Sequence, residues 1–414
     1  MDTIPLLKGK RIVLGVTGGI AAYKICALAS HLTQAGAQVD VVMTEAAERF
    51  VGPLTFEALT GRPVYTSLWE TSEGGLPTHI AHVGLAHVAD LLIIAPATAN
   101  TIAKLAQGVA DNLLSTLALA ARCPLLIAPA MDVGMWNNPA TQANANTLRK
   151  RGAHLVGPAR GRMASGLEGE GRLMEPDEIL GHARLMLGHN RGLSGREVVV
   201  TAGPTREFLD PVRFLTNPSS GRQGFALAQA ALDRGADVTL VTGPTHLSAP
   251  VGAERVDVTT ADELGDAVLK ASAQADVLLM AAAVADYRPR DAAPEKIKKG
   301  AGGITLSFTR TLDVLTEVAE RRAGSGYPRV LVGFAAETED LLANARSKLE
   351  RKGLDLIVAN DVTAPQAGFG VETNRVVLLD RDGGVDEVPL MSKAAVAEVV
   401  LERVMALLGA NGEI

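Results

Sequence analysis

The sequence is poor in cysteine and in aromatic residues. Only Cys26 and Cys123 occur among 414 residues, so a disulfide framework is excluded and a reducing compartment is expected. Aromatic residues make up 3% of the chain, whereas 47% is hydrophobic and 42 residues are glycine. This composition favours closely packed helices on parallel strands, because small side chains let backbones approach each other. A chain of this length accommodates two or three domains, each with its own core.

Long uninterrupted apolar runs and an excess of positive charge are also missing. The most apolar stretch, 113–131, contains an arginine and two prolines, which argues against a membrane span. The first ten residues are too short and too polar for a signal peptide. A net charge of −6 argues against a protein that coats nucleic acid or an acidic membrane surface. We therefore expect a soluble cytoplasmic enzyme with neither nucleic-acid nor membrane partners.

The chain contains a weak internal repeat. Residues 11–43 have the pattern of an apolar strand, a glycine-rich turn, a helix and a second strand, and residues 197–241 repeat it. The first of these helices is predicted to contain the apolar residues Ile20, Ile25, Leu28 and Leu32. Near-continuous apolar strands that alternate with helices indicate parallel sheets covered on both faces. We predict an α/β fold with two doubly wound parallel-sheet domains, residues 1–190 and 191–414.

Glycines follow the first strand of each half. They permit a tight turn and bring backbone N–H groups close to an anionic group. Neither half contains a complete G-x-G-x-x-G pattern. By themselves these loops therefore indicate either a nucleotide site or a tight turn without a ligand.

Five segments of the first half follow one another as they do in the flavin-dependent cysteine decarboxylases, which this half resembles. The segments are 15–24, 80–86, 95–115, 129–136 and 165–172. The resemblance implies a flavodoxin-like domain that binds FMN, oxidises the substrate thiol to a thioaldehyde by passing a hydride to the flavin, and releases carbon dioxide. It also implies that FMN is contacted by Thr17, Gly18, Gly19, Thr44, Ala97, Thr98 and Asn100.

The same resemblance assigns three catalytic positions in the first half. His82 is the expected catalytic base, since imidazole titrates near neutrality, although a lone histidine is more often structural. Asp132 stands where the family usually has asparagine, and an ionised carboxylate there would repel a substrate carboxylate. Ser165 stands where the family often has cysteine on a mobile flap, and a hydroxyl is a weaker acid than a thiol. Two outcomes stay open: decarboxylation with a different proton donor, or a domain that binds FMN and decarboxylates weakly.

Seven segments of the second half resemble the bacterial phosphopantothenate–cysteine ligases that use CTP. The segments are 201–207, 210–217, 219–224, 281–287, 296–299, 333–338 and 360–363. The resemblance implies a Rossmann-like domain and a reaction in two steps. The carboxylate of 4'-phosphopantothenate first attacks the α-phosphorus of CTP, which gives an acyl-cytidylate and pyrophosphate. The amine of cysteine then displaces the nucleotide and forms an amide.

This reaction joins two anions, so lysines and a magnesium ion must offset their repulsion. The resemblance implies that Lys296 supplies the catalytic charge and that Asn217 contacts the acyl-nucleotide carbonyl. Without it, residues 296–299 would be interpreted as a solvated charge run and Phe334 as a core residue. Asp286 is expected to hold either Mg²⁺ or the nucleotide. The implied CTP contacts are Ala281, Ala282, Asp286, Lys296, Phe334 and, on one face of a helix, Lys348 and Lys352.

The leading prediction is a bifunctional decarboxylase and ligase of coenzyme A synthesis, with FMN and Mg²⁺ as cofactors and 4'-phosphopantothenate, cysteine and CTP as substrates. A nicotinamide oxidoreductase would need an acidic residue at the end of the second strand, where Met43 and Thr44 stand. A non-catalytic flavoprotein regulator is disfavoured by the intact Asn217 and Lys296. The resemblance also implies a homo-oligomer, with a trimeric decarboxylase half, a dimeric ligase half and a dodecamer of the fusion.

Overall fold

The computed structural model describes residues 3–69, 76, 78, 80–299, 303–337, 340–361, 366, 368 and 370–410. Residue 338 of the 333–338 segment and residues 362 and 363 of the 360–363 segment lie outside these ranges. The chain divides into two compact units, Met1–Leu187 and Gly188–Ile414. Each unit is a mixed α/β structure built on parallel strands, so the predicted fold class is confirmed.

The first unit is built on a six-stranded parallel sheet in the order β3-β2-β1-β4-β5-β6. The strands are β1 (Arg11–Val16), β2 (Gln38–Met43), β3 (Val64–Tyr65), β4 (Leu91–Ala97), β5 (Leu125–Pro129) and β6 (His154–Leu155). Every residue of β4 is buried, which explains why the central strands are continuous apolar runs. Without the two-residue edge strand β3, the order is that of flavodoxin-like folds, as predicted.

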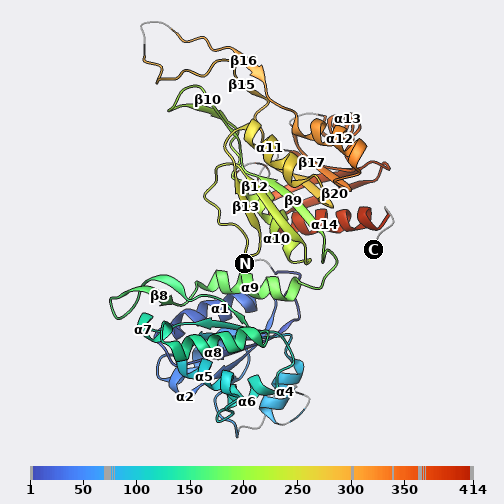
Figure 1. Cartoon of the computed structure of the whole chain (residues 1–414). Helices are drawn as coiled ribbons and strands as arrows, with labels where there is room; N and C mark the ends of the chain where they lie inside the picture. Colours follow the sequence, from blue (N-terminus) through green and yellow to red (C-terminus); the bar gives the residue numbers. More distant parts are fainter. Residues whose placement is uncertain are drawn as a thin grey trace. The chain divides into compact units, whose positions relative to one another are not determined.

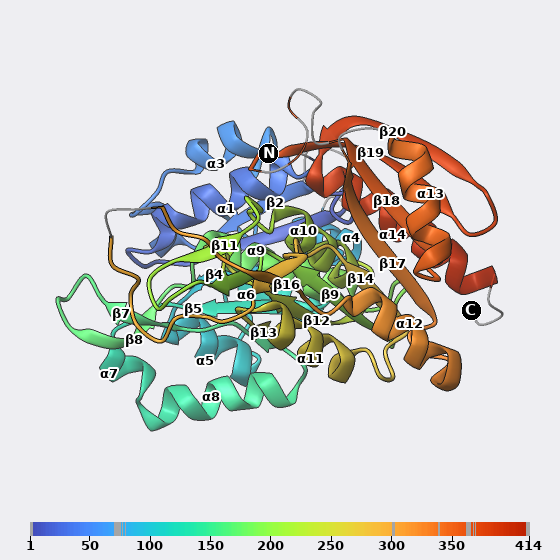
Figure 2. The same cartoon turned by 90° about the horizontal axis from the view of Figure 1, so that it is seen from above.

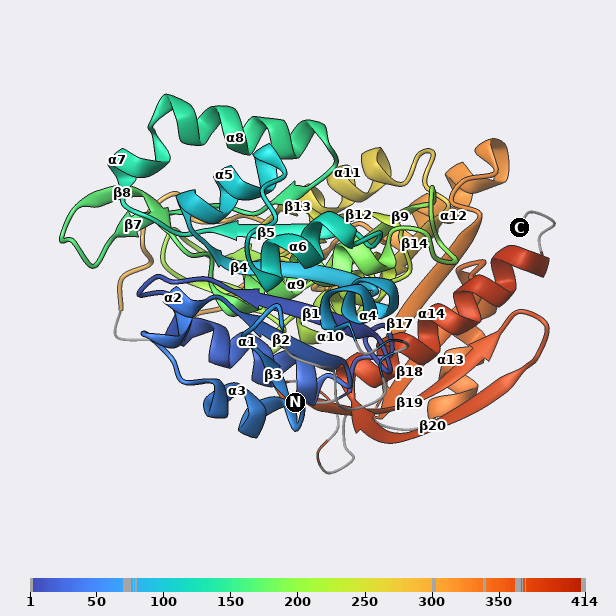
Figure 3. The ribbon, with the colours of Figure 1, turned by 90° about the horizontal axis from the view of Figure 1, so that it is seen from below.

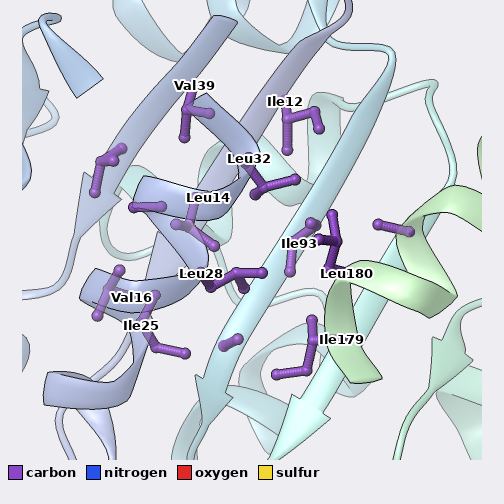
Figure 4. Packing of buried hydrophobic residues seen from close by; sticks show 14 of the residues in the cluster. Ile12, Leu14, Val16, Ile25, Leu28, Leu32, Val39, Ile93, Ile179 and Leu180 are labelled. Atoms are coloured by element: carbon purple, nitrogen blue, oxygen red, sulfur yellow. The ribbon is translucent and has the colours of Figure 1, made fainter. Parts of the chain in front are cut away.

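Helices cover both faces of this sheet (Figure 3). One face carries α1 (Ala22–Gln34), α3 (Pro53–Thr60) and α9 (Pro176–Gly188), whose apolar side chains share one core cluster with those of the sheet. Figure 4 shows the side chains of α1 and α9 against those of β1 and β4. The other face carries α4 (Ala81–Val88), α5 (Ala99–Gln107), α6 (Leu113–Ala120) and α8 (Pro139–Lys150). Two short helices, α2 (Glu45–Glu48) and α7 (Val133–Trp136), and the hairpin β7 (Ala159–Arg162) and β8 (Glu168–Arg172) complete the unit.

The first helix begins later than its apolar spacing predicts. Helix α1 begins at Ala22, after the glycine turn, and Ile20 is 61% exposed. The other three predicted positions, Ile25, Leu28 and Leu32, are fully buried. The prediction that the helix includes Ile20 was therefore wrong, because this residue still belongs to the turn before α1.

The second unit is built on an eight-stranded sheet in the order β13-β12-β9-β14-β17-β18-β19-β20. Its first six strands are parallel and follow the Rossmann order: β9 (Glu197–Ala202), β12 (Asp237–Thr242), β13 (Glu254–Asp257), β14 (Val277–Met280), β17 (Val330–Glu337) and β18 (Leu356–Asp361). The last two, β19 (Thr373–Asp380) and β20 (Val385–Ser392), are antiparallel additions to the predicted sheet. Residues 381–384 alone join them, which is too short for the crossover of a parallel pair.

Helices also cover both faces of the second sheet. One face carries α11 (Ala261–Ala271), α12 (Val314–Ser325) and α13 (Leu341–Arg351). Helices α10 (Arg222–Leu232) and α14 (Lys393–Ala410) pack against each other on the opposite side, and Figure 2 shows α13 and α14 beside β17 to β20. Two hairpins extend away from the sheet (Figure 1): β10 (Arg206–Phe208) with β11 (Phe214–Thr216), and β15 (Tyr287–Pro289) with β16 (Phe308–Arg310). We call these two hairpins the arm.

Candidate functional sites

The predicted site residues gather at the carboxyl ends of the parallel strands in both units. In open α/β sheets, ligands bind at this edge, where the strand order reverses. The reversal lies between β1 and β4 in the first unit and between β9 and β14 in the second. The loops that follow these four strands therefore border the candidate binding sites.

The loop after β1 offers backbone donors to an anion. The Thr17 hydroxyl is buried, donates to the Pro96 carbonyl at 2.5 Å and accepts from the Thr98 backbone N–H at 3.2 Å. It therefore ties the β1 loop to the β4 loop. A Cβ on Gly18 would lie 2.4 Å from a side-chain atom of α2, so this close approach requires glycine. The backbone N–H groups of Gly18 and Gly19 donate to no group within the described part of the chain, which leaves them available to a ligand.

Thr44 follows β2, the strand next to β1, and precedes α2 without a side-chain capping bond. Its hydroxyl oxygen is buried and has no hydrogen-bond partner among the described residues. Buried hydroxyls are normally paired, because leaving one unpaired costs about 1–3 kcal/mol. An unpaired donor at this edge of the sheet fits the phosphate contact expected of Thr44 with FMN.

The loop after β4 holds the remaining flavin candidates. Ala97 is buried at the end of the strand, and Thr98 caps α5 by accepting from the Thr101 backbone N–H at 3.2 Å. The Ala130 N–H donates to the Ala97 carbonyl at 3.1 Å and joins this loop to the end of β5. Asn100 is exposed in the first turn of α5. The structure thus brings Ala97 and Thr98 beside the β1 loop and leaves the Asn100 side chain at the surface.

His82 is half-buried near the start of α4. Its Nδ1 atom is buried and finds no hydrogen-bond partner in the ranges that the structure describes. The side chain also makes no hydrogen bond to any other predicted flavin residue in those ranges. A buried, unpaired imidazole nitrogen is suited to proton exchange with a bound molecule.

Asp132 and Ser165, the two positions that depart from the family pattern, contact each other. The Ser165 hydroxyl donates to Asp132 Oδ2 at 3.1 Å, and Asp132 Oδ1 caps α7 by accepting from the Gly134 N–H at 2.9 Å. Ser165 lies in the turn of the β7–β8 hairpin. The hairpin docks closely, since the Met131 N–H donates to the Gly171 carbonyl at 3.0 Å and a Cβ on Gly171 would lie 2.3 Å from the Met131 oxygen.

The second unit contains a cavity of about 730 Å³ at the carboxyl edge of its sheet. Every predicted ligase residue except Lys296 lines it: Asn217, Ala281, Ala282, Asp286, Phe334, Lys348 and Lys352. These residues come from the ends of four different elements and the loops between them. The structure therefore gathers one predicted set of residues around a space large enough for a nucleotide.

The start of α10 forms one wall of this cavity. Gly221 caps the helix at φ +80°, a conformation that favours glycine, and the first turn contains no acidic residue. A Cβ on Gly224 would lie 2.5 Å from the Ala202 Cβ, so the helix can lie directly against β9 only with glycine there. The positive end of α10 consequently faces the cavity and suits a phosphate.

Asn217 holds the loop after β14 in place. Its Nδ2 group donates to the carbonyl oxygens of Ala283 and Val284, both at 3.1 Å. The same loop is fixed by the Thr201 hydroxyl, which accepts from the Ala282 N–H at 3.0 Å. Both amide hydrogens of Asn217 are therefore used within the protein, and only its Oδ1 atom remains for a ligand.

Charged side chains line the cavity from α12, α13 and the β14 loop. Lys352 caps the end of α13 and donates to Asp313 Oδ1 at 3.1 Å. Burial opposes ionisation of Asp313, but the Lys352 charge and hydrogen bonds hold its pKa below the usual value. Asp286 is exposed, and no cluster of three or more His, Cys, Asp or Glu side chains suited to a metal occurs among the described residues. A single carboxylate together with substrate phosphates is the usual way of holding Mg²⁺, so Asp286 fits that role only with a nucleotide present.

Lys296 lies on the arm and not at the cavity. Its side chain is exposed. The next residue, Ile297, is fixed on both sides: its N–H donates to Asp210 Oδ2 at 3.1 Å, and its carbonyl accepts from Arg213 at 2.7 Å. Asp210 is fully buried and pairs with Arg213, whose guanidinium holds the pKa of this carboxyl well below its usual range.

Several polar residues of the cavity wall were not predicted as site residues, among them Asn360 and Lys393. Asn360 falls in a segment that resembles the family, which is the signal that would have found it. Lys393 donates to the Gly368 carbonyl at 3.0 Å and the Val371 carbonyl at 2.6 Å. Burial, and then the Arg222 charge, lower the pKa of Lys393. Its partners are backbone carbonyls, so no sequence pattern identifies it.

Over the described residues, no helix combines the length and apolar character required to cross a membrane.

Both halves match known protein families. Residues 5–184 match the flavoprotein family, and residues 193–408 match the C-terminal domain of the DNA/pantothenate metabolism flavoproteins. Two solved structures are similar to parts of the chain. The C-terminal domain of a coenzyme A biosynthesis bifunctional protein CoaBC is 37% identical, with a TM-score of 0.46, over 53% of this chain and 100% of its own. A mutant PPC decarboxylase, complexed with pantothenoylaminoethenethiol, is 34% identical, with a TM-score of 0.39, over 43% of this chain and 98% of its own.

Relatives of similar length cover nearly the whole chain. The coenzyme A biosynthesis bifunctional protein CoaBC of Bacillus subtilis (strain 168) is 47% identical over 99% of this chain and 100% of its own. The protein of the same name from Vibrio cholerae is 46% identical over 95% of this chain and 98% of its own. That of Mycobacterium tuberculosis (strain ATCC 25618 / H37Rv) is 47% identical over 96% of this chain and 97% of its own.

The fold, the two sites and the matched domains define a two-domain enzyme that joins a flavoprotein unit to a second α/β unit. The chain belongs to the family of coenzyme A biosynthesis bifunctional proteins. The predicted class, a bifunctional decarboxylase and ligase, is thereby confirmed.

Proposed function

We propose that the second unit joins 4'-phosphopantothenate to cysteine through an acyl-cytidylate made from CTP. The first unit then decarboxylates the product with FMN. The observation that carries the ligase proposal is the cavity that gathers Asn217, Asp286, Phe334, Lys348 and Lys352 at the strand reversal. Family membership supports a role in coenzyme A synthesis, and the cavity residues support the chemical roles proposed for them.

In the first ligase step, a carboxylate oxygen bonds to the α-phosphorus and pyrophosphate leaves. Charge accumulates on the phosphates, where the start of α10 and the side chains of Lys348 and Lys352 offer positive potential. Mg²⁺ would be held by Asp286 together with phosphate oxygens and would offset further charge. In the second step the cysteine amine bonds to the acyl carbon, and the nucleotide leaves with the electron pair.

Asn217 and Lys296 keep their predicted roles only if the structure changes on binding. An Asn217 contact to the acyl carbonyl requires an N–H, and both are given to Ala283 and Val284. Lys296 is on the arm, so it reaches a phosphate only where the arm brings it to a cavity, in its own chain or in a second copy. Exposed apolar side chains on the arm, among them Phe208 and Phe308, support the predicted dimer of this unit. The trimer, the dodecamer and the cytoplasmic location remain predictions.

The first unit fits FMN. Thr44 and the N–H groups of Gly18 and Gly19, which have no acceptor in the described ranges, would hold its phosphate. His82 would take a proton from the substrate. When bound, FMN would supply the acceptor for a hydride from the carbon next to the substrate thiol and would later give that hydride back. Between these events the carbon–carboxylate bond breaks, and its electron pair moves toward sulfur as carbon dioxide departs.

The Asp132–Ser165 hydrogen bond favours a second candidate, a working ligase joined to a weak decarboxylase. The Ser165 hydroxyl donates its hydrogen bond to Asp132, so it cannot protonate a substrate while that bond persists. The asparagine and cysteine that the family usually has would supply a donor at each position instead. Both candidates share the flavin site and differ only in rate.

The ligase is tested with the full chain, phosphopantothenate, cysteine, magnesium and each nucleoside triphosphate in turn. We expect the wild-type chain to release pyrophosphate with CTP. In Lys296→Gln the rate of this release should fall by about 100-fold or more, since one oriented charge in a transition state contributes several kcal/mol. Lys270→Gln, an exposed lysine of α11, is the matched control. No pyrophosphate from the wild-type chain with any nucleotide would refute the proposal.

The decarboxylase is tested with FMN-loaded full chain and phosphopantothenoylcysteine. The leading candidate predicts steady carbon dioxide release that the double variant Asp132→Asn, Ser165→Cys changes less than about threefold. The weak-decarboxylase candidate predicts that the double variant is at least about tenfold faster. His82→Asn should abolish release in either case, and unimpaired release would remove His82 from the mechanism.

A further inference from the structure

A lysine occupies an unfavourable place at the start of α14. Lys393 is the first residue of this helix, is only 7% exposed and lines the ligase cavity. Burial, and then the nearby charge of Arg222 on α10, lower its pKa. The positive end of α14 also repels the ammonium, and the first turn of the helix contains no acidic residue to offset this. Buried charges that persist under such conditions are commonly functional.

The ammonium of Lys393 holds backbone and not a carboxylate. Its Nζ atom donates to the carbonyl oxygens of Gly368 at 3.0 Å and Val371 at 2.6 Å. Gly368 is buried and lines the same cavity. Hydrogen bonds from a charged donor are about twice as strong as neutral ones, and burial keeps water from competing with them. Lys393 therefore fixes the part of the cavity wall that Gly368 contributes.

The same backbone connects Lys393 with the start of α10. The Lys393 N–H donates to the Glu372 carbonyl at 3.0 Å, and the Glu372 carboxylate pairs with Arg222 Nη2 at 2.8 Å. The Lys393 carbonyl accepts from the Gln223 side chain at 3.1 Å. Arg222, the first residue of α10, lines the cavity, and its Nε atom is buried without a hydrogen-bond partner among the described residues. A buried donor in the cavity wall is available to an anion.

We propose that Lys393 is a positioning residue of the ligase: it holds the chain at Val371 and Glu372 so that Arg222 stays at the cavity. This proposal rests on the ligation proposed for the second unit. The Arg222–Glu372 ion pair does not suffice, because 77% of the Glu372 side chain is exposed and exposed pairs contribute little. Two bonds from a buried ammonium supply the constraint that this pair lacks. A substrate phosphate at the start of α10 would also offset the positive charge gathered there.

The test measures KM for each substrate by steady-state pyrophosphate release from the full chain with magnesium. Lys393→Met keeps most of the side-chain length and removes the charge and the donors. We expect KM to rise by about 10-fold or more for the substrate whose phosphate lies at α10, CTP or phosphopantothenate, the effect of one charge-assisted hydrogen bond lost. KM for cysteine, which carries no phosphate, should change by less than about twofold.

Arg234→Met is the matched control. Arg234 follows the other end of α10, is also 7% exposed and pairs with Glu398 of α14 at 2.7 Å. It is absent from the cavity wall. This variant loosens the same pair of helices away from the cavity, so each KM should change by less than about twofold.

A double variant separates positioning from direct contact with a substrate. If Lys393 acts through Arg222, the variant Lys393→Met, Arg222→Met should have a KM within about threefold of that of Arg222→Met alone, because the two residues then work as one unit. Independent contacts to the substrate would instead multiply the two single effects.

Hydrogen exchange of the full chain without substrates gives a measurement that does not depend on ligation. Lys393→Met should speed exchange at residues 370–374 by about 10-fold or more, because the bonds that hold this backbone are lost. Arg234→Met should leave exchange at these residues unchanged.

The outcomes separate this proposal from the ligation itself. The positioning role is overturned by an unchanged KM in Lys393→Met, by an equal rise in Arg234→Met, or by a double variant whose effect is the product of the two single effects. If the wild-type chain releases no pyrophosphate with any nucleotide, the proposed ligation is refuted. Exchange at residues 370–374 then decides alone: faster exchange in Lys393→Met only would support the hold of Lys393 on the cavity wall, and unchanged exchange would overturn it.

Discussion

The unpaired hydroxyl of Thr44 allows flavin binding to be separated from folding. Thr44→Val replaces the hydroxyl by a methyl group of nearly the same size and keeps the β-branched shape. Since Oγ1 has no partner among the described residues, the substitution removes no internal hydrogen bond there. Without flavin, the variant should be as stable as the wild type or up to about 1 kcal/mol more stable, because a buried unpaired group is gone.

When FMN is bound, Thr44→Val should be unfavourable and not neutral or stabilising. A hydrogen bond to a charged phosphate contributes about 1.5–3 kcal/mol, so the dissociation constant for FMN should rise by about 10- to 150-fold. Riboflavin has the same ring system without the phosphate. Its affinity should therefore change by less than about twofold, because Thr44 is proposed to contact only the phosphate.

The assay is the quenching of flavin fluorescence on titration with flavin-free protein. Thr17→Val serves as the comparison, because the Thr17 hydroxyl has two internal partners in the β4 loop. That variant should lose about 1–3 kcal/mol of stability even without flavin. Equal losses for FMN and riboflavin in Thr44→Val, or no loss for either, would refute the phosphate assignment.

Three further predictions concern acid stability, the arm and the ligase cavity. Burial, reinforced by His154 at 3.0 Å, lowers the pKa of His182 from 6.5 to about 4, so the unfolded chain binds the proton first and stability falls as pH drops from about 6.5 to 4. The full shift corresponds to about 3 kcal/mol of stability, which solvent access to the half-buried ring reduces to about 1 kcal/mol. In urea unfolding, His182→Gln should lose less stability than the wild type between pH 7 and pH 4.5. An equal loss of stability in both proteins would contradict the assignment. Asp210→Ala removes the acceptor of five hydrogen bonds at the root of the arm, so hydrogen exchange should speed up around Lys296 while the sheet stays protected. Gly224→Ala places a Cβ 2.5 Å from Ala202, so thermal unfolding should show a loss of about 1–3 kcal/mol and nucleotide binding should weaken, whereas unchanged values would mean that α10 tolerates a shift.

The sheet architecture was predictable because it depends on local patterns. A fully buried strand such as β4 must be apolar throughout, and a glycine after a strand or helix marks a change of direction. These signals predicted two doubly wound sheets. The boundary of α1 was missed, because apolar spacing alone cannot tell that Ile20 still belongs to the preceding turn.

The site was predictable where the family pattern places residues at strand ends. The resemblance named Asn217, Phe334 and Lys348, and the topology brings them to one cavity. Contacts between distant residues were not predictable. Ser165 meets Asp132 across 33 positions, and the separation of Lys296 from the cavity depends on how the arm extends. Such contacts result from tertiary packing, and no periodic pattern in a single sequence predicts them.

The edge strand β20 limits how this protein can assemble. An exposed sheet edge invites another chain to add a strand, and natural proteins block it with charge and proline. Strand β20 carries Asp386 and Glu387, and Pro389 has no N–H to offer a further strand. The eight-stranded sheet therefore cannot continue into a second molecule at this edge. Association of the second unit on this side must therefore use side-chain surfaces, which blocks strand-by-strand growth into fibres at the β20 end of the sheet.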